Sequence, residues 1–289
     1  MDSIKPKISI VIVSWNVKKL LEANLARLFS LKCGYPFEVF VVDNGSVDGS
    51  AAMVREKFPK VKLITNDWDA GFAGPNNQAL RLAQGEVCLL LNPDMLLEEG
   101  TLDATYQKLM TDKSIGVMSV KLIGQDGQPI KGSVRHFPDL RSQLIILLKL
   151  NHLFPELLKK YLWSDFDFEK SQDVDQVRGS YFAFRRELLD SVGYLDSGYH
   201  IWFEEVDYCK RVLKAELRVY YFSEASAHDY VGKGLNQMKR LETQMIFGNS
   251  MTRYFRKWHP LWQVGLILLA RPIGLLAALV YDLRHAPKT

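Results

Sequence analysis

Short apolar runs alternate with segments of helical periodicity along the first part of the chain. Residues 8–13 (ISIVIV), 37–42 (FEVFVV) and 87–91 (VCLLL) are almost wholly apolar, which predicts buried β-strands. Between the first two runs, residues 18–31 place leucines at roughly helical spacing, which predicts a helix. The same patterns predict helix 50–58, strand 61–65, helix 75–83, helix 102–110 and strand 116–122. This alternation predicts an α/β fold, with a mostly parallel, Rossmann-like sheet flanked by helices on both faces.

The second part of the chain is less regular. An Asp-Gly pair at residues 124–127 (GQDG) favours a hairpin and ends the parallel pattern. Residues 140–163 are leucine-rich and amphipathic with a break near Pro155, which predicts a helical insertion. Beyond it, residues 177–184 predict a strand and residues 202–211 predict the start of a helix.

The last part of the chain changes character. Residues 262–281 are almost wholly apolar and are interrupted by Arg271 and Pro272 near their middle. The length permits a bilayer span, but a central arginine costs roughly 2.5–3.5 kcal/mol on insertion scales and proline breaks a helix. We therefore expect a helical hairpin or a segment lying at a membrane surface, with a span and a structural or dimer helix as alternatives. We therefore expect two parts. Residues 1–235 form one domain with the halves 1–123 and 124–235, and the second half contains the helical insertion 140–163. Residues 236–289 form a C-terminal apolar helical segment.

Composition and charge narrow the class of protein. With 289 residues, of which 47% are hydrophobic and 24% charged, the chain can bury a sizeable core. A net charge of +4 is only mildly basic, which favours contact with phosphates or anionic lipid and does not indicate nucleic-acid binding. Cys33, Cys88 and Cys209 are odd in number and lack metal-type spacing, which indicates a reducing compartment. The N-terminus shows no signal-peptide pattern, so we expect the body of the protein in the cytoplasm.

Two predicted strands end on a carboxylate. Asp43 follows the second strand, and Asp94 follows the strand at residues 87–91. Ligands of open α/β sheets bind at such strand ends, so the two acids suggest one shared cleft. A strand-end carboxylate such as Asp43 can accept a hydrogen bond from the N–H of a uracil or thymine base. The alternative is that Asp43, like Ser46 and Asp48 after it, only caps a turn or the next helix.

A glycine-rich loop and an acidic cluster complete the candidate chemistry. Residues 71–74 (GFAG) precede a predicted helix, where exposed N–H groups suit a diphosphate or a sugar hydroxyl, with a plain tight turn as the alternative. Glu204, Glu205 and Asp207 form the acidic cluster best suited to take a proton from an acceptor hydroxyl. If this segment is helical, Asp207 lies near Arg211, which fits a structural ion pair as well.

Five motifs in order along the chain carry a resemblance to a known family. They are IVIVSWN at residues 10–16, VDNGSVDGS at 42–50, Asn66 with GFAGPNN at 71–77, LNPD at 91–94 and FEEVD at 203–207. Together they resemble the family-two inverting glycosyltransferases of GT-A fold, most closely the bacterial rhamnosyltransferase-like branch. The resemblance extends over residues 7–230, so it covers both halves of the expected domain.

The resemblance implies a GT-A fold that binds a nucleoside diphosphate sugar as donor. The donor-binding residues that it implies are Ser14, Trp15, Asn16, Asp43, Asn44, Ser46, Asn66, Gly71, Phe72, Gly74, Asn77, Asn92, Pro93 and Asp94. It also implies that Asp94 and His228 hold a divalent cation, Mg²⁺ or Mn²⁺, that neutralises charge on the departing diphosphate. The usual Asp-x-Asp reads Asn92-Pro93-Asp94 here, so an amide replaces one carboxylate and leaves the metal's identity and affinity open.

The resemblance also assigns catalytic and acceptor residues. It aligns the family's Glu-Asp pair with Glu204 and Glu205 and puts the general base on Glu205, with Glu204 and Asp207 as the other candidates. The expected acceptor or phosphate contacts are Arg178, Gly179 and Ser180; a strand with an exposed arginine is the alternative.

The implied reaction is the inverting transfer of a sugar to a lipid-linked saccharide in cell-surface polysaccharide synthesis. L-Rhamnose from dTDP-rhamnose is the best match for the donor, and the expected place is the cytoplasmic face of the inner (plasma) membrane, with the protein peripheral or monotopic. The alternatives are a transferase that uses a UDP-sugar and a non-catalytic, membrane-associated nucleotide-sugar-binding protein. A nucleotidyltransferase would need a glycine-rich, basic loop after the first strand, where this chain has SWNVK.

Overall fold

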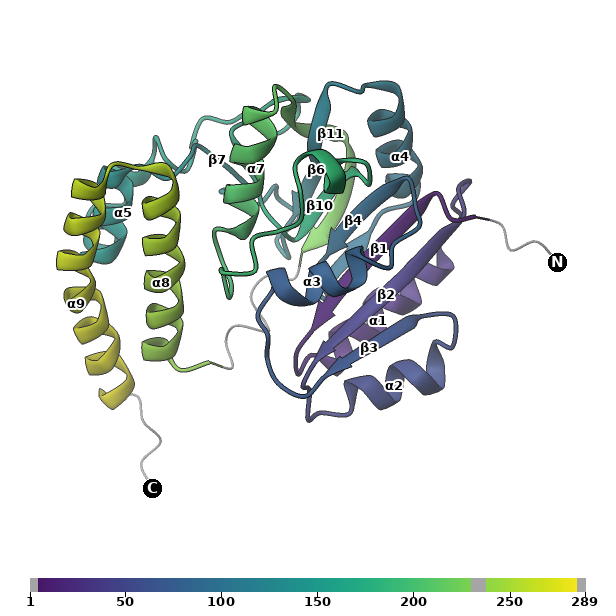
Figure 1. The fold of residues 1–289 in the computed structure, drawn as a ribbon, viewed down its shortest axis with the longest axis horizontal. Helices are drawn as coiled ribbons and strands as arrows, with labels where there is room; N and C mark the ends of the chain where they lie inside the picture. Colours follow the sequence, from purple (N-terminus) through teal and green to yellow (C-terminus); the bar gives the residue numbers. More distant parts are fainter. Residues whose placement is uncertain (1–4, 230–237, 285–289) are drawn as a thin grey trace.

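One large β-sheet forms the body of the protein (Figure 1). The computed structural model describes residues 5–229 and 238–284, so the expected boundary between residues 235 and 236 lies outside the described residues. Within them, the nine strands of the sheet are β1 (Ile8–Ser14), β2 (Phe37–Asn44), β3 (Lys62–Asn66), β4 (Val87–Leu91), β5 (Met95–Leu97), β6 (Ile115–Ile123), β8 (Gln172–Asp173), β10 (Tyr181–Arg185) and β11 (Arg218–Asp229). A separate ladder pairs β7 (Val134–Arg135) with β9 (Gln176–Val177).

The sheet joins a parallel half to a mixed half. In the order β3-β2-β1-β4-β10-β6-β11-β5, the first four strands are parallel and β10 is antiparallel to both of its neighbours. β6 and β11 are parallel, whereas the short strands β5 and β8 pair antiparallel with β11. The carboxyl ends of β1 to β4 therefore meet the amino end of β10 at one edge, where Tyr181 pairs with Leu91.

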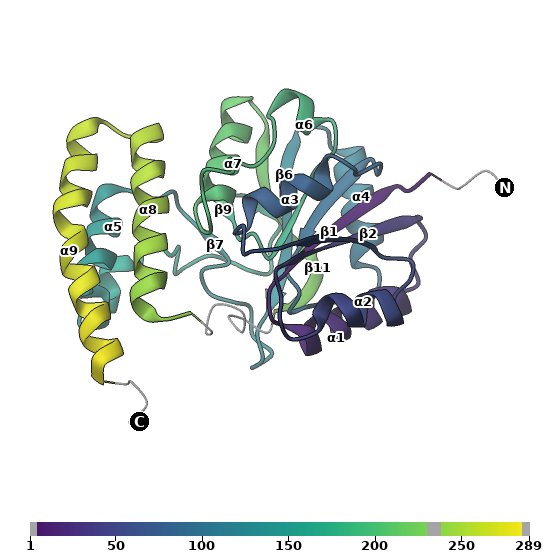
Figure 2. The same cartoon turned by 60° about the horizontal axis from the view of Figure 1, so that its bottom comes forward.

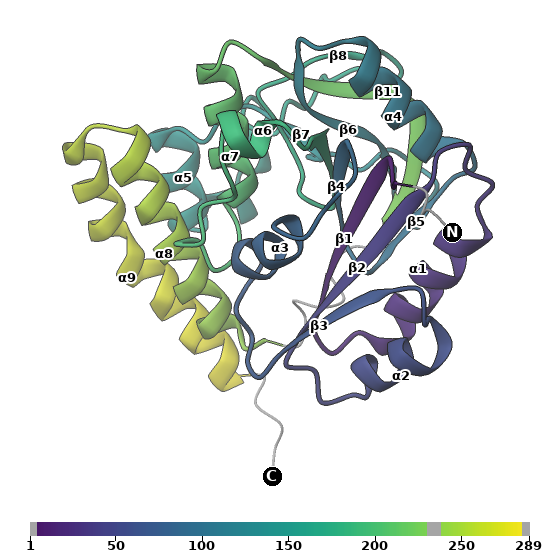
Figure 3. The ribbon, with the colours of Figure 1, turned by 45° about the vertical axis from the view of Figure 1, so that its right-hand side comes forward.

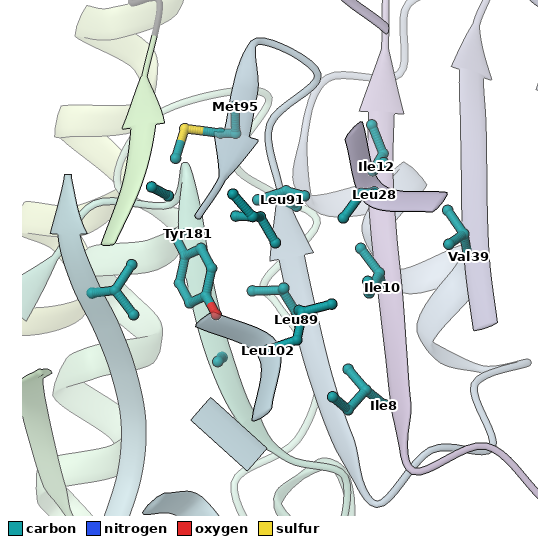
Figure 4. Packing of buried hydrophobic residues seen from close by; sticks show 14 of the residues in the cluster. Ile8, Ile10, Ile12, Leu28, Val39, Leu89, Leu91, Met95, Leu102 and Tyr181 are labelled. Carbon is teal, nitrogen blue, oxygen red and sulfur yellow. The ribbon is translucent and has the colours of Figure 1, made fainter. Parts of the chain in front are cut away.

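Helices cover both faces of the sheet (Figures 1 and 2). On one face lie α1 (Lys18–Ser30), α2 (Ser50–Lys57) and α4 (Thr101–Thr111), and on the other lie α3 (Ala73–Leu80), α6 (Leu188–Ser191) and α7 (Glu204–Lys214). Ile10 and Ile12 of β1 pack on the first side beside Leu89 of β4 (Figure 4), whereas Val11 packs on the second. Because successive strand residues point to opposite faces, burial of both faces explains why these strands are continuous apolar runs.

Two long helices form a hairpin beside the sheet (Figures 1 and 3). They are α8 (Arg240–Trp258) and α9 (Leu261–Arg284), and α9 also packs on α5 (Leu140–Leu147). Met251, Tyr254 and Phe255 of α8 bury an apolar cluster with Tyr199 and Phe203, which joins the hairpin to the body of the protein.

The structure contains every strand and helix predicted up to residue 123 and adds β5 to them. Two elements predicted further along are interrupted. The predicted strand at residues 177–184 is divided between β9 and β10, with residues 178–180 as the loop between them. The predicted helical stretch 140–163 forms α5 and then two 3-10 turns, η1 (Leu150–His152) and η2 (Pro155–Leu158).

The C-terminal helix also differs from the prediction. α9 continues through Pro272, so the hairpin is made by α8 and α9 and not within residues 262–281. The Arg271 guanidinium donates hydrogen bonds to Asn249 Oδ1 (2.7 Å) and Thr252 Oγ1 (3.2 Å) of α8, and these contacts hold α9 at the point where proline removes a backbone donor. Leu261–Val280 is long and apolar enough to cross a membrane, and 28% of it is buried against the rest of the protein.

Candidate active site

A cavity of about 210 Å³, which we call the donor cavity, opens at the sheet edge where the parallel strands end. Its wall combines the ends of β1, β2 and β4 with the loop before β10 and the start of α7. The predicted site residues that line it are Trp15, Asn44, Gly71, Phe72, Asn92, Pro93, Asp94, Arg178, Gly179, Ser180, Glu204 and Glu205. The fold thus brings together residues from all five sequence motifs.

Ser14 and Asp43 lie side by side at the ends of β1 and β2, where the strand register pairs them. Both are buried. Asp43 Oδ2 accepts a hydrogen bond from the Ser46 N–H (3.1 Å), but Asp43 Oδ1 and Ser14 Oγ have no hydrogen-bond partner within the described residues. Buried polar atoms are rarely left unpaired, so this pair offers hydrogen-bonding capacity to a ligand.

Asn16 and Ser46 connect the loops that follow β1 and β2. The Asn16 N–H donates to Ser46 Oγ (2.9 Å), and Asn16 Oδ1 accepts from the N–H of the residue after Ser46 (2.8 Å). Asp48 accepts from the N–H groups of Lys18 and Ser50, the first residues of α1 and α2. The capping alternative therefore describes Asp48, whereas Asn16 and Ser46 shape the loops beside the donor cavity.

The glycine-rich loop is held against the segment before α7. Asp69 accepts hydrogen bonds from Asn44 Nδ2 (2.7 Å) and from the Gly71 N–H (2.9 Å). Its other oxygen lies 3.4 Å from His200 Nε2, a contact that raises the pKa of His200. Gly71 has a φ of +76°, and a Cβ there would lie 2.0 Å from the His200 carbonyl oxygen, so this position requires glycine.

Seven predicted donor residues are not among those that line the donor cavity, namely Ser14, Asn16, Asp43, Ser46, Asn66, Gly74 and Asn77. The first four lie beside it as described above, and the other three serve elsewhere. Asn66 exchanges side-chain hydrogen bonds with Gln78 (3.1 and 3.2 Å), and Asn77 exchanges two with the backbone of Leu195 (2.8 and 3.1 Å). Gly74 lies in α3, with open space where a Cβ would be. These residues anchor the loop and α3, and the structure does not bring them to the position expected of a donor ligand.

Asp94 reaches the donor cavity from the loop between β4 and β5. Burial raises its pKa to about 6, the negative charge of Asp229 adds to this rise, and Arg178 opposes it. Asp229 is the last residue of β11, is buried, and has its Oδ2 3.4 Å from Arg178 Nη1. Two carboxylates and one guanidinium therefore meet beside the donor cavity.

The two carboxylates of Asp94 and Asp229 fit a hard divalent cation. Mg²⁺ is commonly held by one or two carboxylates together with substrate phosphates. Across residues 5–229 and 238–284, no group of three or more His, Cys, Asp and Glu side chains gathers in a way that can hold a metal. We therefore expect a cation to bind here together with a diphosphate, which would supply the remaining oxygen ligands.

His228, the other predicted metal ligand, lies in β11 and points elsewhere. Its Nε2 lies 2.6 Å from Glu98 Oε1. Neighbouring residues of a strand point to opposite faces, so His228 and Asp229 diverge. Asp229 is therefore the residue of β11 that stands next to Asp94.

Glu204 and Glu205 enter the donor cavity at the N-terminus of α7. Trp202 and Phe203 before them take left-handed conformations with φ values of 66° and 70°, which are strained for bulky residues. Such strain is typical of functional sites because the surrounding fold must maintain it. Here it fixes the direction in which the chain enters α7 and so the placement of both carboxylates.

The two glutamates differ in their electrostatic surroundings. Burial raises the pKa of Glu204 well above its usual value, and the charge of Glu205 raises it further. Burial also raises the pKa of Glu205, but backbone hydrogen bonds and the charges of Arg135 and Arg178 make this rise smaller. In each carboxylate, Oε2 has no hydrogen-bond partner in the described part of the chain. Of the two, Glu205 therefore has the surroundings that better support the negative charge of a general base.

Asp207 faces away from the donor cavity and joins α7 to α8. Its carboxylate is fully buried, accepts a hydrogen bond from Trp258 Nε1 (2.8 Å), and forms ion pairs with Arg211 (3.0 Å) and Lys257 (2.7 Å). The pairing with Arg211 is the structural alternative that the sequence spacing allowed. Asp207 is thus a structural residue in this fold and not one of the acids at the site.

Replacing Asp207 tests this distinction. Asp207→Asn is expected to lower the free energy of unfolding by about 2–3 kcal/mol, less than for a fully buried pair because the side chain of Lys257 is 36% exposed. The kcat of the folded enzyme should change little. Chemical denaturation and transfer rates would measure the two effects, with Glu22→Gln as a control that removes a separate, more exposed ion pair with Lys57. A large loss of kcat at unchanged stability would instead make Asp207 catalytic.

Among the site residues that were not predicted from the sequence, four carry a charged or aromatic side chain. Asp69, His200 and Trp202 line the donor cavity, and Asp229 lies beside Asp94. The sequence offered a weak signal for two of them, since Asp69 precedes the glycine-rich loop and Asp229 follows His228 directly. The segment that holds His200 and Trp202 carries no motif.

A parallel half-sheet is joined through an antiparallel strand to a mixed half, and acids from both halves lie around one cavity. This is the arrangement expected of the GT-A fold. The comparisons with known proteins agree with this fold. The family model "Glycosyl transferase family 2" matches residues 9–193, and the chain belongs to this family.

Relatives with curated names share about a quarter of the sequence. The chain is 26% identical over 220 residues to the N-acetylglucosaminyl-diphospho-decaprenol L-rhamnosyltransferase of Mycobacterium tuberculosis. This alignment covers 71% of this chain and 70% of that protein. It is 22% identical over 218 residues to the low-salt glycan biosynthesis hexosyltransferase Agl10 of Haloferax volcanii, which covers 73% of this chain. The match spans 63% of the archaeal protein, which is less than two thirds of its length.

A solved structure shows the same fold. The mannosyltransferase PcManGT from Pyrobaculum calidifontis, in complex with GDP-Man and Mn²⁺, aligns with a TM-score of 0.59 and 21% identity over 98% of this chain and 77% of that one. At this identity the likeness concerns the fold, and it agrees with the arrangement of the sheet described above.

Proposed function

We propose that the protein is an inverting glycosyltransferase that moves a sugar from a nucleoside diphosphate to a lipid-linked saccharide. The observation that carries the proposal is that Asp94 and Glu205 face one cavity from two different elements, the loop after β4 and the start of α7. The name of the mycobacterial relative specifies rhamnosyl transfer to a diphospholipid-linked sugar, so L-rhamnose from dTDP-rhamnose is the leading donor.

Residues of the parallel half would bind the donor. The unpaired Asp43 Oδ1 and Ser14 Oγ at the ends of β2 and β1 suit the polar edge of a base or ribose. Asp94 and Asp229 would hold a divalent cation, which when bound neutralises negative charge on the diphosphate. Arg178, 3.4 Å from Asp229, adds a fixed positive charge on the same side of the site.

Glu205 would act on the acceptor. Its carboxylate takes the proton of the acceptor hydroxyl while the acceptor oxygen forms a bond to the anomeric carbon of the sugar. The bond from that carbon to the diphosphate oxygen breaks in the same displacement, and the nucleoside diphosphate leaves with the electron pair. Attack opposite the leaving group inverts the anomeric configuration, as in inverting glycoside hydrolysis with the acceptor in place of water.

A donor screen tests this proposal. Purified protein is given a panel of nucleoside diphosphate sugars, with and without Mg²⁺ or Mn²⁺, and the slow release of nucleoside diphosphate is followed without acceptor. Release from a single donor would support the proposal and identify the sugar, and release from a UDP-sugar would replace dTDP-rhamnose. Binding of one donor without turnover, even when lipid-linked acceptors are added, would favour the non-catalytic alternative.

The exposed side of α9 supports the proposed place at a membrane surface. Trp262, Leu269 and Leu276 recur every seven residues on this helix and are 61%, 75% and 62% exposed, so they form one apolar stripe. Exposed apolar stripes on helices are typical of membrane-surface contacts and protein interfaces. A site beside the membrane would keep the enzyme near an acceptor that cannot leave the bilayer. The stripe lies within the C-terminal segment 236–289 that the sequence analysis separated from the rest of the chain. We therefore propose this segment as the part of the protein that associates with the membrane.

Polar substitutions on this stripe test the membrane contact. Ile273 is 52% exposed and lies four residues after Leu269, on the same side of the helix. The triple variant Leu269→Gln, Ile273→Gln, Leu276→Gln is expected to reduce binding to vesicles of phosphatidylethanolamine and phosphatidylglycerol at least about tenfold, since each leucine or isoleucine buried in lipid contributes about 1.5–3 kcal/mol. Co-sedimentation measures this binding. The control variant Leu82→Gln, Leu213→Gln changes exposed leucines on the body of the protein and should bind as wild type. Unchanged vesicle binding by the triple variant, with a loss of dimers instead, would make the stripe an interface between copies of the chain.

A further inference from the structure

A second cavity, of about 340 Å³, adjoins the donor cavity. Arg178, Trp202 and Glu205 line both cavities, so Glu205 stands in the wall between them. The rest of the second cavity is formed by the ladder of β7 and β9, the end of α5 and the start of α8. Its lining therefore combines residues beside the sheet with residues of the first helix of the C-terminal hairpin. We call this cavity the basic cavity.

Three cations and one acid line the basic cavity. Arg178 is paired with Asp229, but Arg135 and Lys149 have no carboxylate within ion-pair distance among the residues that the structure describes. Arg135 Nε donates to the carbonyl of Gly132 (2.7 Å) and Lys149 Nζ donates to Gln244 Oε1 (2.7 Å), so their hydrogen bonds among the described residues go to neutral groups. In the part of the chain that the structure describes, the only carboxylate that shares the lining of this cavity with them is that of Glu205, whose pKa the charge of Arg135 lowers.

Lys149 lies in surroundings that disfavour its charge. Burial lowers its pKa, and the charge of Arg240 lowers it further. Lys149 also takes a left-handed conformation, with a φ of 59°. A half-buried lysine without a counter-ion, on a strained backbone, is explained if an anion joins it in a bound state.

Ser133 provides a second, independent sign of a ligand. This residue lines the basic cavity, is 4% exposed, and its Oγ has no hydrogen-bond partner in the described residues. A buried hydroxyl is seldom left unpaired. Phosphate oxygens accept several hydrogen bonds at once, so a phosphate or diphosphate group would satisfy Ser133, Arg135 and Lys149 together.

We propose that the basic cavity binds the phosphate-bearing end of the acceptor, with Arg135 and Lys149 as its charged ligands and Ser133 as a hydroxyl donor. This inference rests on the proposed function. It adds that the basic cavity recognises the anionic group of the acceptor. The proposed donor and cation residues Asn44 and Asp94 line only the donor cavity. An acceptor anchored in the basic cavity would therefore approach Glu205 from the side opposite the donor.

The first test uses inorganic pyrophosphate as the probe and needs no turnover. Pyrophosphate is titrated calorimetrically into the full chain in EDTA, with and without saturating dTDP. Wild type should bind it in both cases, and Arg135→Gln and Lys149→Gln should each weaken binding about tenfold, as expected for a charge-assisted hydrogen bond. Lys131→Gln, an exposed lysine nearby in the chain, is the matched control and should bind as wild type. If wild type did not bind pyrophosphate, the acceptor assignment would be overturned. Loss of binding when dTDP is added would also overturn it, because that result would place the anion in the donor cavity.

The second test separates binding from structural effects. With a diphosphate-bearing acceptor, Arg135→Gln and Lys149→Gln should raise the acceptor KM about tenfold more than the donor KM. Lys149→Gln should also unfold at or above the wild-type temperature, because it removes an uncompensated cation, and Lys149→Arg should restore pyrophosphate binding. If both KM values changed equally, these residues would be structural. The same conclusion would follow if Lys149→Gln unfolded at a lower temperature and still bound pyrophosphate as wild type does. If no nucleotide sugar is turned over, the proposed function fails while the calorimetric result still stands.

Discussion

Glu205→Gln is expected to lower the kcat of sugar transfer by about 10²–10⁴-fold, the range that a positioned general base contributes. Glu205 lines both cavities, and its Oε2 has no hydrogen-bond partner in the described residues. Glutamine keeps the size of the side chain but cannot take a proton from the acceptor hydroxyl. Because the donor is bound by other residues, the affinity for nucleoside diphosphate, measured by calorimetry, should stay close to that of wild type.

Glu204→Gln is the matched control for this experiment. Burial and the charge of Glu205 raise the pKa of Glu204 well above its usual value, so Glu204 is the weaker candidate to carry the negative charge that a base needs. This variant should therefore keep most of its transfer activity. The wild-type kcat should rise with pH as Glu205 loses its proton. Glu205→Gln should lack this part of the rise and keep only the part due to Asp94, whose pKa is about 6. If Glu204→Gln abolished transfer and Glu205→Gln did not, the base would be Glu204.

The parallel half of the fold could be predicted because its signals are local. Its strands are buried on both faces, so residues such as Val11 and Leu90 give continuous apolar runs. The break in the predicted strand 177–184 has no such local signal. Val177 pairs with Val134 in a separate ladder, whereas Tyr181 pairs with Leu91 in the main sheet. Only these long-range pairings show that Arg178 to Ser180 form a loop at the donor cavity.

Site residues that directly follow the end of a strand could be predicted from the sequence. Those whose side-chain direction depends on long-range contacts could not. Asp94 lies at the edge that the strand pattern predicted. Asn77, in contrast, is drawn to the backbone of Leu195, 118 residues away in the chain. Asp207 is similar, since its partner Trp258 lies on a helix that the local pattern does not relate to α7. Side-chain type and spacing thus indicate candidates, but the direction of each side chain depends on what the fold packs against it.

The second large effect is expected at the cation position. Asp94→Asn should lower kcat by about 10³-fold or more, since a metal that neutralises the leaving group contributes several kcal/mol. The variant would leave only Asp229 as a carboxylate there, and Asp229 already has Arg178 within 3.4 Å. Binding of Mn²⁺ in the presence of nucleoside diphosphate, followed by calorimetry, should be lost with it. Asn92→Asp, which adds a carboxylate on the same loop, is the opposite variant and should tighten Mn²⁺ binding.

The pH dependence distinguishes this role from that of Glu205. Because the pKa of Asp94 is raised to about 6, its carboxylate takes up a proton as the pH falls through that value and can no longer hold a cation. Metal and proton compete for the same oxygens, so raising the Mn²⁺ concentration should move the acid limb of activity to lower pH. The limb due to Glu205 should stay in place, because that residue holds no metal. An acid limb that does not respond to Mn²⁺, together with an active Asp94→Asn variant, would show that Arg178 and not a cation neutralises the leaving group.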